Sequence, residues 1–322
     1  MTTKRASYVL WTVLAIVLSV NIIAYMQARA MTHFTQAGQR TEPPERLSVG
    51  AKIRTVLSGV TIPRPENHHT PADLKLPYAV HWIHEPDGTR LEGWIVPYPD
   101  SHGVVLLFHA YAVSKETLLA PASAFHELGY DTLLLDFRGS GGSSGHETSL
   151  GVREGTDVAW AVIYTQHMWP GKPIILYGVS MGAVAILRAI ATAGVAPAAI
   201  ILESPFDRLD TAVTNRVRAM GLPGFPVAEL LVFWGSMQEG FDGFAHNPVD
   251  YATTVRCPAL LLLGDEDARV TIAQGTHVFD KLHEPKQLVR FPHANHEFLL
   301  LEDPVTWRRH VMQFLESVKQ HV

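Results

Sequence analysis

Cysteine and concentrated charge are scarce in this chain of 322 residues. Its single cysteine, Cys257, excludes an internal disulfide and a multi-cysteine metal site, and its position before an apolar run predicts a small buried residue. The net charge of -5 is mild and spread out, so the sequence lacks the basic clusters typical of nucleic-acid-binding proteins. None of the 17 histidines has H-E-x-x-H or similar ligand spacing. The sequence therefore implies no metal, no organic cofactor and no nucleic-acid partner.

One long hydrophobic run lies at the N-terminus. Lys4 and Arg5 precede an apolar stretch over residues 8–26, which as a helix would span about 30 Å, the thickness of a bilayer's hydrocarbon core. The alternative is a cleavable signal peptide, because Ala-Arg-Ala at residues 28–30 fits the small-x-small cleavage pattern. We favour an uncleaved signal anchor or transmembrane segment over residues 1–30, because the apolar stretch is long for a signal peptide. Either interpretation puts the rest of the chain outside the cytoplasm, membrane-anchored or secreted.

The rest of the chain divides by composition. Residues 31–75 are a proline-rich lead-in, interpreted as a stem and docking segment with one short helix that begins at Pro43-Pro44 and ends at Gly59. In residues 76–322, unbroken apolar runs alternate with helical ones, which predicts an α/β domain with a mostly parallel sheet of eight strands and helices on both faces. The expected strands cover residues 78–84, 90–96, 104–108, 132–135, 173–177, 198–202, 259–263 and 287–291. The expected helices include residues 117–128, 151–167, 183–191 and 304–318.

The alternation of strands and helices is suspended over residues 206–255. This interval holds residues 213–220, a Gly-Leu-Pro-Gly turn at residues 221–224 and an apolar cluster at residues 230–234. An insertion after the sixth strand lies near the carboxyl ends of the parallel strands, where ligands bind in such sheets. We therefore favour a small helical lid that shapes an apolar pocket. The alternative is one or two extra helices packed on the core.

The pentapeptide Gly178-Val179-Ser180-Met181-Gly182 is the most informative motif of the chain. An apolar run precedes it and strong helix formers follow it, which predicts a nucleophile elbow on a strand-to-helix turn. Such a turn holds the serine in a strained, exposed conformation, and a β-carbon at either glycine would collide with the neighbouring strand or helix. The N–H of Met181 and the helix N-terminus would face an anion that forms over Ser180. The alternative is a chance match in a loop.

A serine hydroxyl is a poor nucleophile at neutral pH, so Ser180 needs a base. The base should lie on a loop after the last strand, and His296 lies between that expected strand and the final helix. His293 is the local competitor. We favour His296, because His293 directly follows the strand and its proline, a place typical of a structural residue.

The base in turn needs an orienting acid. The strand at residues 259–263 runs into Gly264-Asp265-Glu266-Asp267, which offers three carboxylates. We favour Asp267, because it lies clear of the strand end and before the turn into the next helix. Asp265 and Glu266 remain alternatives, interpreted as solvated loop charges or helix caps.

The oxyanion that forms during acyl transfer needs a second N–H besides that of Met181. The loop after the third strand, Phe108-His109-Ala110-Tyr111, is placed to supply it, with the N–H of Tyr111 as the donor. We interpret His109 as a structural loop histidine and not as a second base.

With these residues in place, the chain from about residue 78 to its end resembles the serine α/β-hydrolases of the serine-aminopeptidase and monoacylglycerol-lipase-like group. The order Ser180, Asp267, His296 is that of the family's triad. Residues 136–143 are similar to the family's D-x-R-G-x-G-x-S loop, whose arginine would tie loops together near the site, and Glu-Ser-Pro at residues 203–205 also fits. One departure is alanine at position 110, where the family usually has glycine; its methyl group could narrow the oxyanion hole.

The resemblance and the candidate triad imply a serine-dependent hydrolase, carboxylesterase- or lipase-like, that cleaves lipid-like or small acyl esters through an acyl-serine intermediate. A peptidase or thioesterase would use the same triad, and these alternatives stay open. Dehalogenase and epoxide-hydrolase chemistry is disfavoured, because those relatives have an aspartate where this chain has Ser180. An alternative of another class is a non-catalytic, membrane-anchored scaffold. The expected partners are a small-molecule acyl substrate and, through the N-terminal helix, a membrane.

Overall fold

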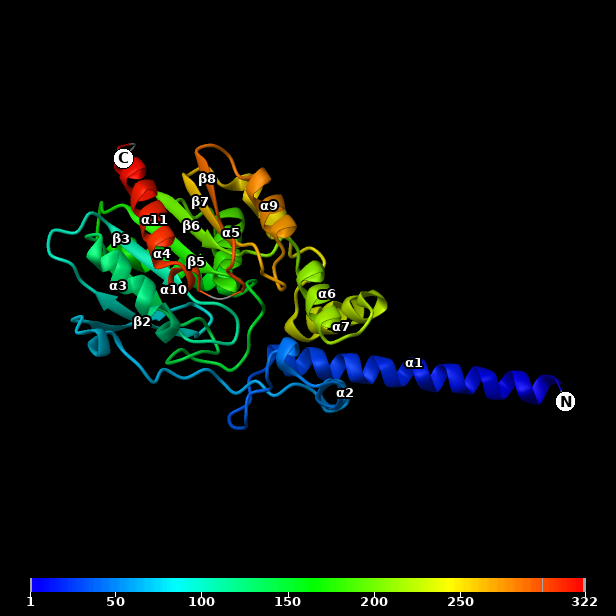
Figure 1. Cartoon of the computed structure of the whole chain (residues 1–322). Helices are drawn as coiled ribbons and strands as arrows, with labels where there is room; N and C mark the ends of the chain where they lie inside the picture. Colours follow the sequence, from blue (N-terminus) through cyan, green and yellow to red (C-terminus); the bar gives the residue numbers. More distant parts are fainter. Residues whose placement is uncertain (1, 297, 321–322) are drawn as a thin grey trace. The chain divides into compact units, whose positions relative to one another are not determined.

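The computed structural model describes residues 2–296 and 298–320 of the chain (Figure 1). It divides into two compact units, which we call the helical unit (residues 1–63 and 209–245) and the sheet unit (residues 64–208 and 246–322). Most of the interval expected to form a lid, residues 206–255, therefore belongs to the helical unit. The lead-in at residues 31–75 is shared between the two units. A lid function for the interval stays a prediction.

The sheet unit contains an eight-stranded sheet in the order β1-β2-β4-β3-β5-β6-β7-β8. The two N-terminal strands form an antiparallel hairpin, β2 also pairs antiparallel with β4, and all remaining pairs are parallel. The prediction of eight strands in a mostly parallel sheet is confirmed. The strands are β1 (Ala79–His84), β2 (Arg90–Val96), β3 (Val104–Phe108), β4 (Asp131–Leu135), β5 (Ile174–Val179), β6 (Ala199–Glu203), β7 (Ala259–Gly264) and β8 (Lys286–Phe291).

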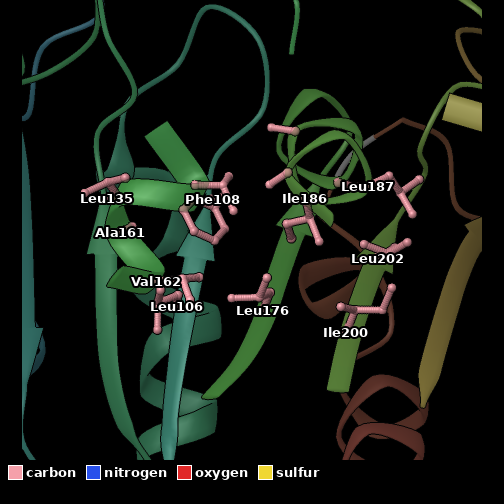
Figure 2. Packing of buried hydrophobic residues seen from close by; sticks show 14 of the residues in the cluster. Leu106, Phe108, Leu135, Ala161, Val162, Leu176, Ile186, Leu187, Ile200 and Leu202 are labelled. Atoms are coloured by element: carbon pink, nitrogen blue, oxygen red, sulfur yellow. The ribbon is translucent and has the colours of Figure 1, made fainter. Parts of the chain in front are cut away.

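Helices cover both faces of this sheet, because the central strands are apolar on both sides. One face packs against α4 and α5, and the other against α3 and α11. Figure 2 shows the first of these layers, with Leu106, Leu176 and Ile200 of neighbouring strands side by side near α4 and α5. The helices of the sheet unit are η2 (Pro71–Leu74), η3 (Lys115–Leu118), α3 (Leu119–Glu127), α4 (Glu154–Met168), α5 (Met181–Ala193), α8 (Pro248–Tyr251), η4 (Ala252–Thr254), α9 (Ile272–Lys281), α10 (Leu299–Glu302) and α11 (Pro304–Lys319).

Local capping explains several helix boundaries. Thr271 and Gln274 form a reciprocal capping box at the start of α9, and the carboxylate of Asp303 accepts from the N–H of Thr306 at the start of α11. The helix expected at residues 117–128 instead begins as the 3-10 turn η3 and continues as α3. Cys257, expected to be buried, is half-buried.

The helical unit consists of α1 (Thr2–Thr32), η1 (Pro44–Arg46), α2 (Val49–Ser58), α6 (Leu209–Ala219) and α7 (Gly224–Glu239). The expected start of a helix at Pro43-Pro44 is wrong: the prolines lead into the short turn η1, and α2 begins only after Ser48, whose hydroxyl accepts from the N–H of Ala51. The end of α2 before Gly59 is as expected.

The first helix, α1, changes character along its length. Its residues from Tyr8 to Val20 are exposed, whereas Ala24, Ala28 and Thr32 recur every four residues as a buried stripe. Within the helical unit, α1 packs beside α7: the rings of Tyr25 and Trp234 meet edge to face at 5.5 Å between centroids. In the described part of the chain, α1 is the one helix long and apolar enough to cross a membrane, a test that a signal sequence also passes.

We expect Leu176→Ala to destabilise the sheet unit by about 2–5 kcal/mol, because Leu176 lies at the centre of the packed layer and is fully buried, so truncation leaves a cavity. The control is Val305→Ala, since Val305 is 74% exposed and its truncation should change stability by less than about 0.5 kcal/mol. Urea denaturation followed by circular dichroism measures both. Equal midpoints for the two variants would contradict the proposed core.

Candidate active site

Ser180 lies on the turn between β5 and α5, as the motif predicts. Its backbone has φ 50° and ψ -110°, a strained conformation for a residue with a side chain. A β-carbon on Gly178 would lie 2.6 Å from the backbone N of Ala183, and one on Gly182 would lie 2.3 Å from the carbonyl O of Phe108. The expected need for both glycines is therefore confirmed. The expected exposure of the serine is wrong: Ser180 is only 8% exposed, and an imidazole covers its hydroxyl.

That imidazole belongs to His296, on the loop after β8. Its Nε2 lies 3.1 Å from Oγ of Ser180, and its Nδ1 lies 2.7 Å from Oδ2 of Asp267. Asp267 follows β7 and is buried, and its other oxygen accepts from the N–H groups of Arg269 and Val270, at 2.8 Å each. These two backbone bonds hold the carboxylate in place. Three side chains that are far apart in sequence thus form one hydrogen-bonded line.

The competing residues lie elsewhere. The side chain of His293 is 94% exposed, with Nδ1 3.6 Å from a carboxylate oxygen of Glu266. Asp265 forms a two-point ion pair with Arg290, with Nε to Oδ1 at 2.8 Å. Of the two candidate histidines and three candidate carboxylates, the geometry joins His296 and Asp267 to Ser180.

The loop after β3 runs directly beside the serine turn. The space where a β-carbon of Gly182 would lie is bounded by the carbonyl oxygens of Phe108 and His109, so this loop and the first turn of α5 are in backbone contact. Tyr111 follows two residues later. Ala110 lies outside the left-handed region of backbone conformation, where Ala112 is found at φ 56°. Alanine at position 110 therefore meets no backbone strain that would call for glycine.

His109 is completely buried and joins two loops. Its Nε2 accepts from the N–H of Phe137, at 3.0 Å, and its Nδ1 lies 2.8 Å from the carbonyl O of Ala110. Burial lowers the pKa of this imidazole, which favours the neutral ring that these two bonds require. These contacts agree with the structural role expected of it.

Arg138 ties loops together, as the family resemblance implies. Its guanidinium contacts Asp157 of α4 at 2.6 Å and Glu85 of the β1–β2 turn at 3.0 Å. Burial and the neighbouring carboxylate of Asp157 raise the pKa of Glu85. The preceding Asp136 forms a fully buried ion pair with Lys115. None of these groups contacts the side chains of the candidate triad, so their role is to hold loops.

The sequence reasoning gave no role to Glu203, the last residue of β6. Its carbonyl O accepts from the N–H of Ser180 at 2.8 Å, and its buried carboxylate accepts from the hydroxyl of Tyr177 at 2.8 Å and from Nε1 of Trp307 at 2.6 Å. It thereby links β6 to the serine turn, to β5 and to α11. The feature of the sequence that could have indicated this role is a carboxylate at the end of an apolar strand.

In the described part of the chain, no group of three or more His, Cys, Asp or Glu side chains is arranged to hold a metal ion.

Comparison with known proteins finds several similar chains. The family model described as serine aminopeptidase, S33, matches residues 99–234. The uncharacterized protein YqkD of Bacillus subtilis is 25% identical over 234 residues, which are 72% of this chain and 77% of that protein. The lysophosphatidylserine lipase ABHD12 of Danio rerio is 26% identical over 204 residues, which are 59% of this chain and 50% of the lipase.

Solved structures agree on the fold. The esterase Pf2001 of Pyrococcus furiosus has a TM-score of 0.66 over 79% of this chain and 98% of the esterase, at 24% identity. The chain therefore resembles the serine α/β-hydrolases, and the α/β-hydrolase fold predicted from the sequence is confirmed. The family model and the lipase among the relatives support a hydrolase activity.

We expect Glu203→Gln to alter how stability depends on pH. Burial raises the pKa of Glu203 from 4.5 to about 6, so between these values the folded chain holds a proton that the unfolded chain has lost. The stabilising contribution of this proton is present below about pH 4.5 and is lost as the pH rises through about 6. Glutamine does not ionise, so the wild type should lose stability relative to the variant across this window. Thermal denaturation at several pH values measures the difference, and a constant gap in Tm would contradict the assignment.

Proposed function

We propose that this chain is a serine hydrolase that cleaves carboxylic esters through an acyl-serine intermediate. The observation that carries the proposal is the line of hydrogen bonds from Asp267 through His296 to Ser180, because it supplies a nucleophile, a base and an acid that orients the base. The strained turn that carries the serine is a second support, since it is the backbone expected of a nucleophile elbow.

In the proposed mechanism, Ser180 attacks the ester carbonyl carbon while Nε2 of His296 takes the hydroxyl proton. Asp267 holds the imidazole and stabilises its positive charge. The N–H groups of Met181 and Tyr111 bind the oxyanion, and the imidazolium gives its proton to the leaving alcohol. Water then attacks the acyl-serine with His296 again as base, which releases the carboxylic acid and restores the serine.

Esters of lipid-like or small acyl groups are the proposed substrates. Two observations favour this choice: the solved relative Pf2001 is an esterase, and the zebrafish relative is named as a lipase for lysophosphatidylserine. The apolar helix α1 would hold the enzyme at a surface rich in such esters. A peptidase or a thioesterase would use the same groups, so a panel of matched esters, arylamides and thioesters with one acyl chain decides among them.

We also propose that α1 is retained as a membrane anchor, with the catalytic domain outside the cytoplasm. Ala24 and Ala28 are buried in the helical unit, and the side-chain amide of Gln27 donates to the carbonyl groups of Thr55 and Val56 at the end of α2, at 2.7 and 2.8 Å. Cleavage after Ala30 would remove all of these contacts. A helix with a structural role in the folded unit is expected to stay attached.

We expect Ser180→Ala to abolish hydrolysis of short p-nitrophenyl esters and labelling by a fluorophosphonate probe, because loss of the triad serine costs about 10⁶ in turnover. Circular dichroism checks that the variant stays folded. Undiminished labelling of this variant would refute the assignment and favour the non-catalytic scaffold.

The neighbouring side chains offer matched controls for the other two triad members. His296→Ala and Asp267→Asn should each lower kcat by about 10⁴ or more. His293→Ala and Asp265→Asn, at exposed or partly exposed positions on the same loops, should leave kcat close to that of the wild type. If the two control variants lost activity and the two triad variants kept it, the roles of acid and base would have to be reassigned.

For the anchor, we expect the mature protein to keep its first thirty residues and to remain with the membrane after alkaline carbonate extraction, since about 20 apolar residues hold a helix in a bilayer. Intact-mass measurement of the purified protein reports the N-terminus directly. A mature chain that begins at Met31 and washes off the membrane would replace the anchor with a signal peptide.

A further inference from the structure

A cavity of about 240 Å³ lies within the helical unit, among α1, α2, α6, α7 and the segment near η1. Fifteen of its twenty lining residues are apolar, among them Ile23 of α1, Val217 of α6 and Leu231 of α7. In the described part of the chain, all of its lining residues belong to the helical unit, and none of them is a candidate catalytic residue. It therefore needs an explanation other than the proposed ester hydrolysis.

The walls of this cavity are mostly apolar, which disfavours ordered water over an apolar molecule. A buried water needs two to four polar partners, and apolar cavities of about 150 Å³ stay dry and take up apolar molecules instead. The amide N–H groups of Gln27, a polar lining residue, are already bonded to two carbonyl groups of α2. At about 30 Å³ for a group the size of a water molecule or a methylene, the space accommodates about eight such groups in a chain.

The surroundings indicate which apolar molecule is available. Val20 and Ile23 of α1 line the cavity. Val20 is also the last residue of the exposed, apolar part of α1 that begins at Tyr8. The walls also carry exposed apolar side chains on their outer sides, including Ile53 of α2 and Phe233 of α7. Such surfaces favour the boundary between the headgroups and the acyl chains of a bilayer. At that depth, hydrocarbon chains are the most abundant apolar molecules.

One charged side chain indicates which polar group the bound hydrocarbon molecule would carry. Arg216 of α6 lines the cavity and is half-buried. A guanidinium pairs well with a carboxylate. Glu42, also on the lining, is exposed and would disfavour an anion on its own side. The cavity therefore suits a chain with one anionic head placed at Arg216.

We propose that the helical unit binds one fatty acid, with about eight methylene groups in the cavity and the carboxylate beside Arg216. The binding does not rest on the proposed catalysis, although a fatty acid is also the product that hydrolysis of a lipid ester would release. The site would let the membrane-facing unit hold an acyl chain independently of the active site.

The test measures the binding of radiolabelled saturated carboxylates with 6 to 14 carbons. The protein is the full chain carrying Ser180→Ala in phosphatidylcholine nanodiscs, and the binding to empty nanodiscs is subtracted. Each methylene that enters the cavity should raise the affinity about fourfold. The gain should end near ten carbons, when the cavity is full. A chain-length dependence that is absent, or that continues unchanged to 14 carbons as in simple partition into lipid, would overturn the proposal.

Matched variants locate the site. Leu231→Trp fills the cavity and should remove the gain with chain length, whereas Phe233→Trp, on the same helix but 45% exposed and outside the lining, should keep it. Arg216→Gln should weaken binding of every carboxylate about two- to fivefold without changing the gain per methylene. Arg218→Gln, exposed and outside the lining, should have no effect.

Two further measurements keep the proposal open to refutation. Val213→Phe fills the same cavity from α6 and replaces Leu231→Trp if circular dichroism shows that variant to be unfolded. Light scattering then compares the oligomeric state of the variants with that of the wild type. If a cavity-filling variant turned a dimer into a monomer while fatty-acid binding was unchanged, a second copy of the chain would be the occupant and the proposal would fail.

Discussion

The close approach between the first turn of α5 and the end of β3 is the constraint on which the candidate site depends. It is possible only because Gly182 has no side chain, since a β-carbon there would lie 2.3 Å from the carbonyl O of Phe108. The contact brings the loop after β3 beside the serine turn, where Ser180 has φ 50°. The N–H of Ser180 is held in the same place by the carbonyl of Glu203. The two strands that flank β5, β3 and β6, therefore both contribute contacts to the turn that carries Ser180.

Several buried charged side chains of the sheet unit join one element to another. Glu203 bonds to side chains on β5 and α11, Arg138 bridges α4 and the β1–β2 turn, and Lys115 pairs with Asp136 in the interior. Breaking the buried ion pair of Lys115 and Asp136 by removing one partner costs several kcal/mol, because the other charge is left unpaired. Of these groups, Glu203 bonds directly to the serine turn, and the others join elements elsewhere in the sheet unit.

Much of the sheet was predictable from the sequence. Its strands are short apolar runs bounded by turn residues, so the expected ranges for β2 and β3 coincide with those observed. The candidate site was predictable for a related reason: Ser180, Asp267 and His296 each follow a strand whose carboxyl end lies at the same edge of a parallel sheet. Their hydrogen bonds follow from that placement.

Features that depend on distant residues were not predictable. The start of α3 as a 3-10 turn includes Lys115, whose buried partner Asp136 lies 21 residues later in the chain. The prolines before α2 were expected to begin a helix, but Ser48 caps it. The division into two units was missed because residues 209–245 pack with residues 1–63, and the amino-acid composition does not show which distant segments pack together.

That division has a consequence for synthesis. The stripe of Ala24 and Ala28 on α1 meets α7 near Gly235, about 200 positions further along the chain. At about 5–20 residues per second, α1 leaves the ribosome about 10–40 s before its partner helix exists. Six of the eight strands are made in that interval. The newborn chain therefore carries an open helix face while the sheet begins to assemble, and the helical unit closes only after the ribosome has passed residue 245.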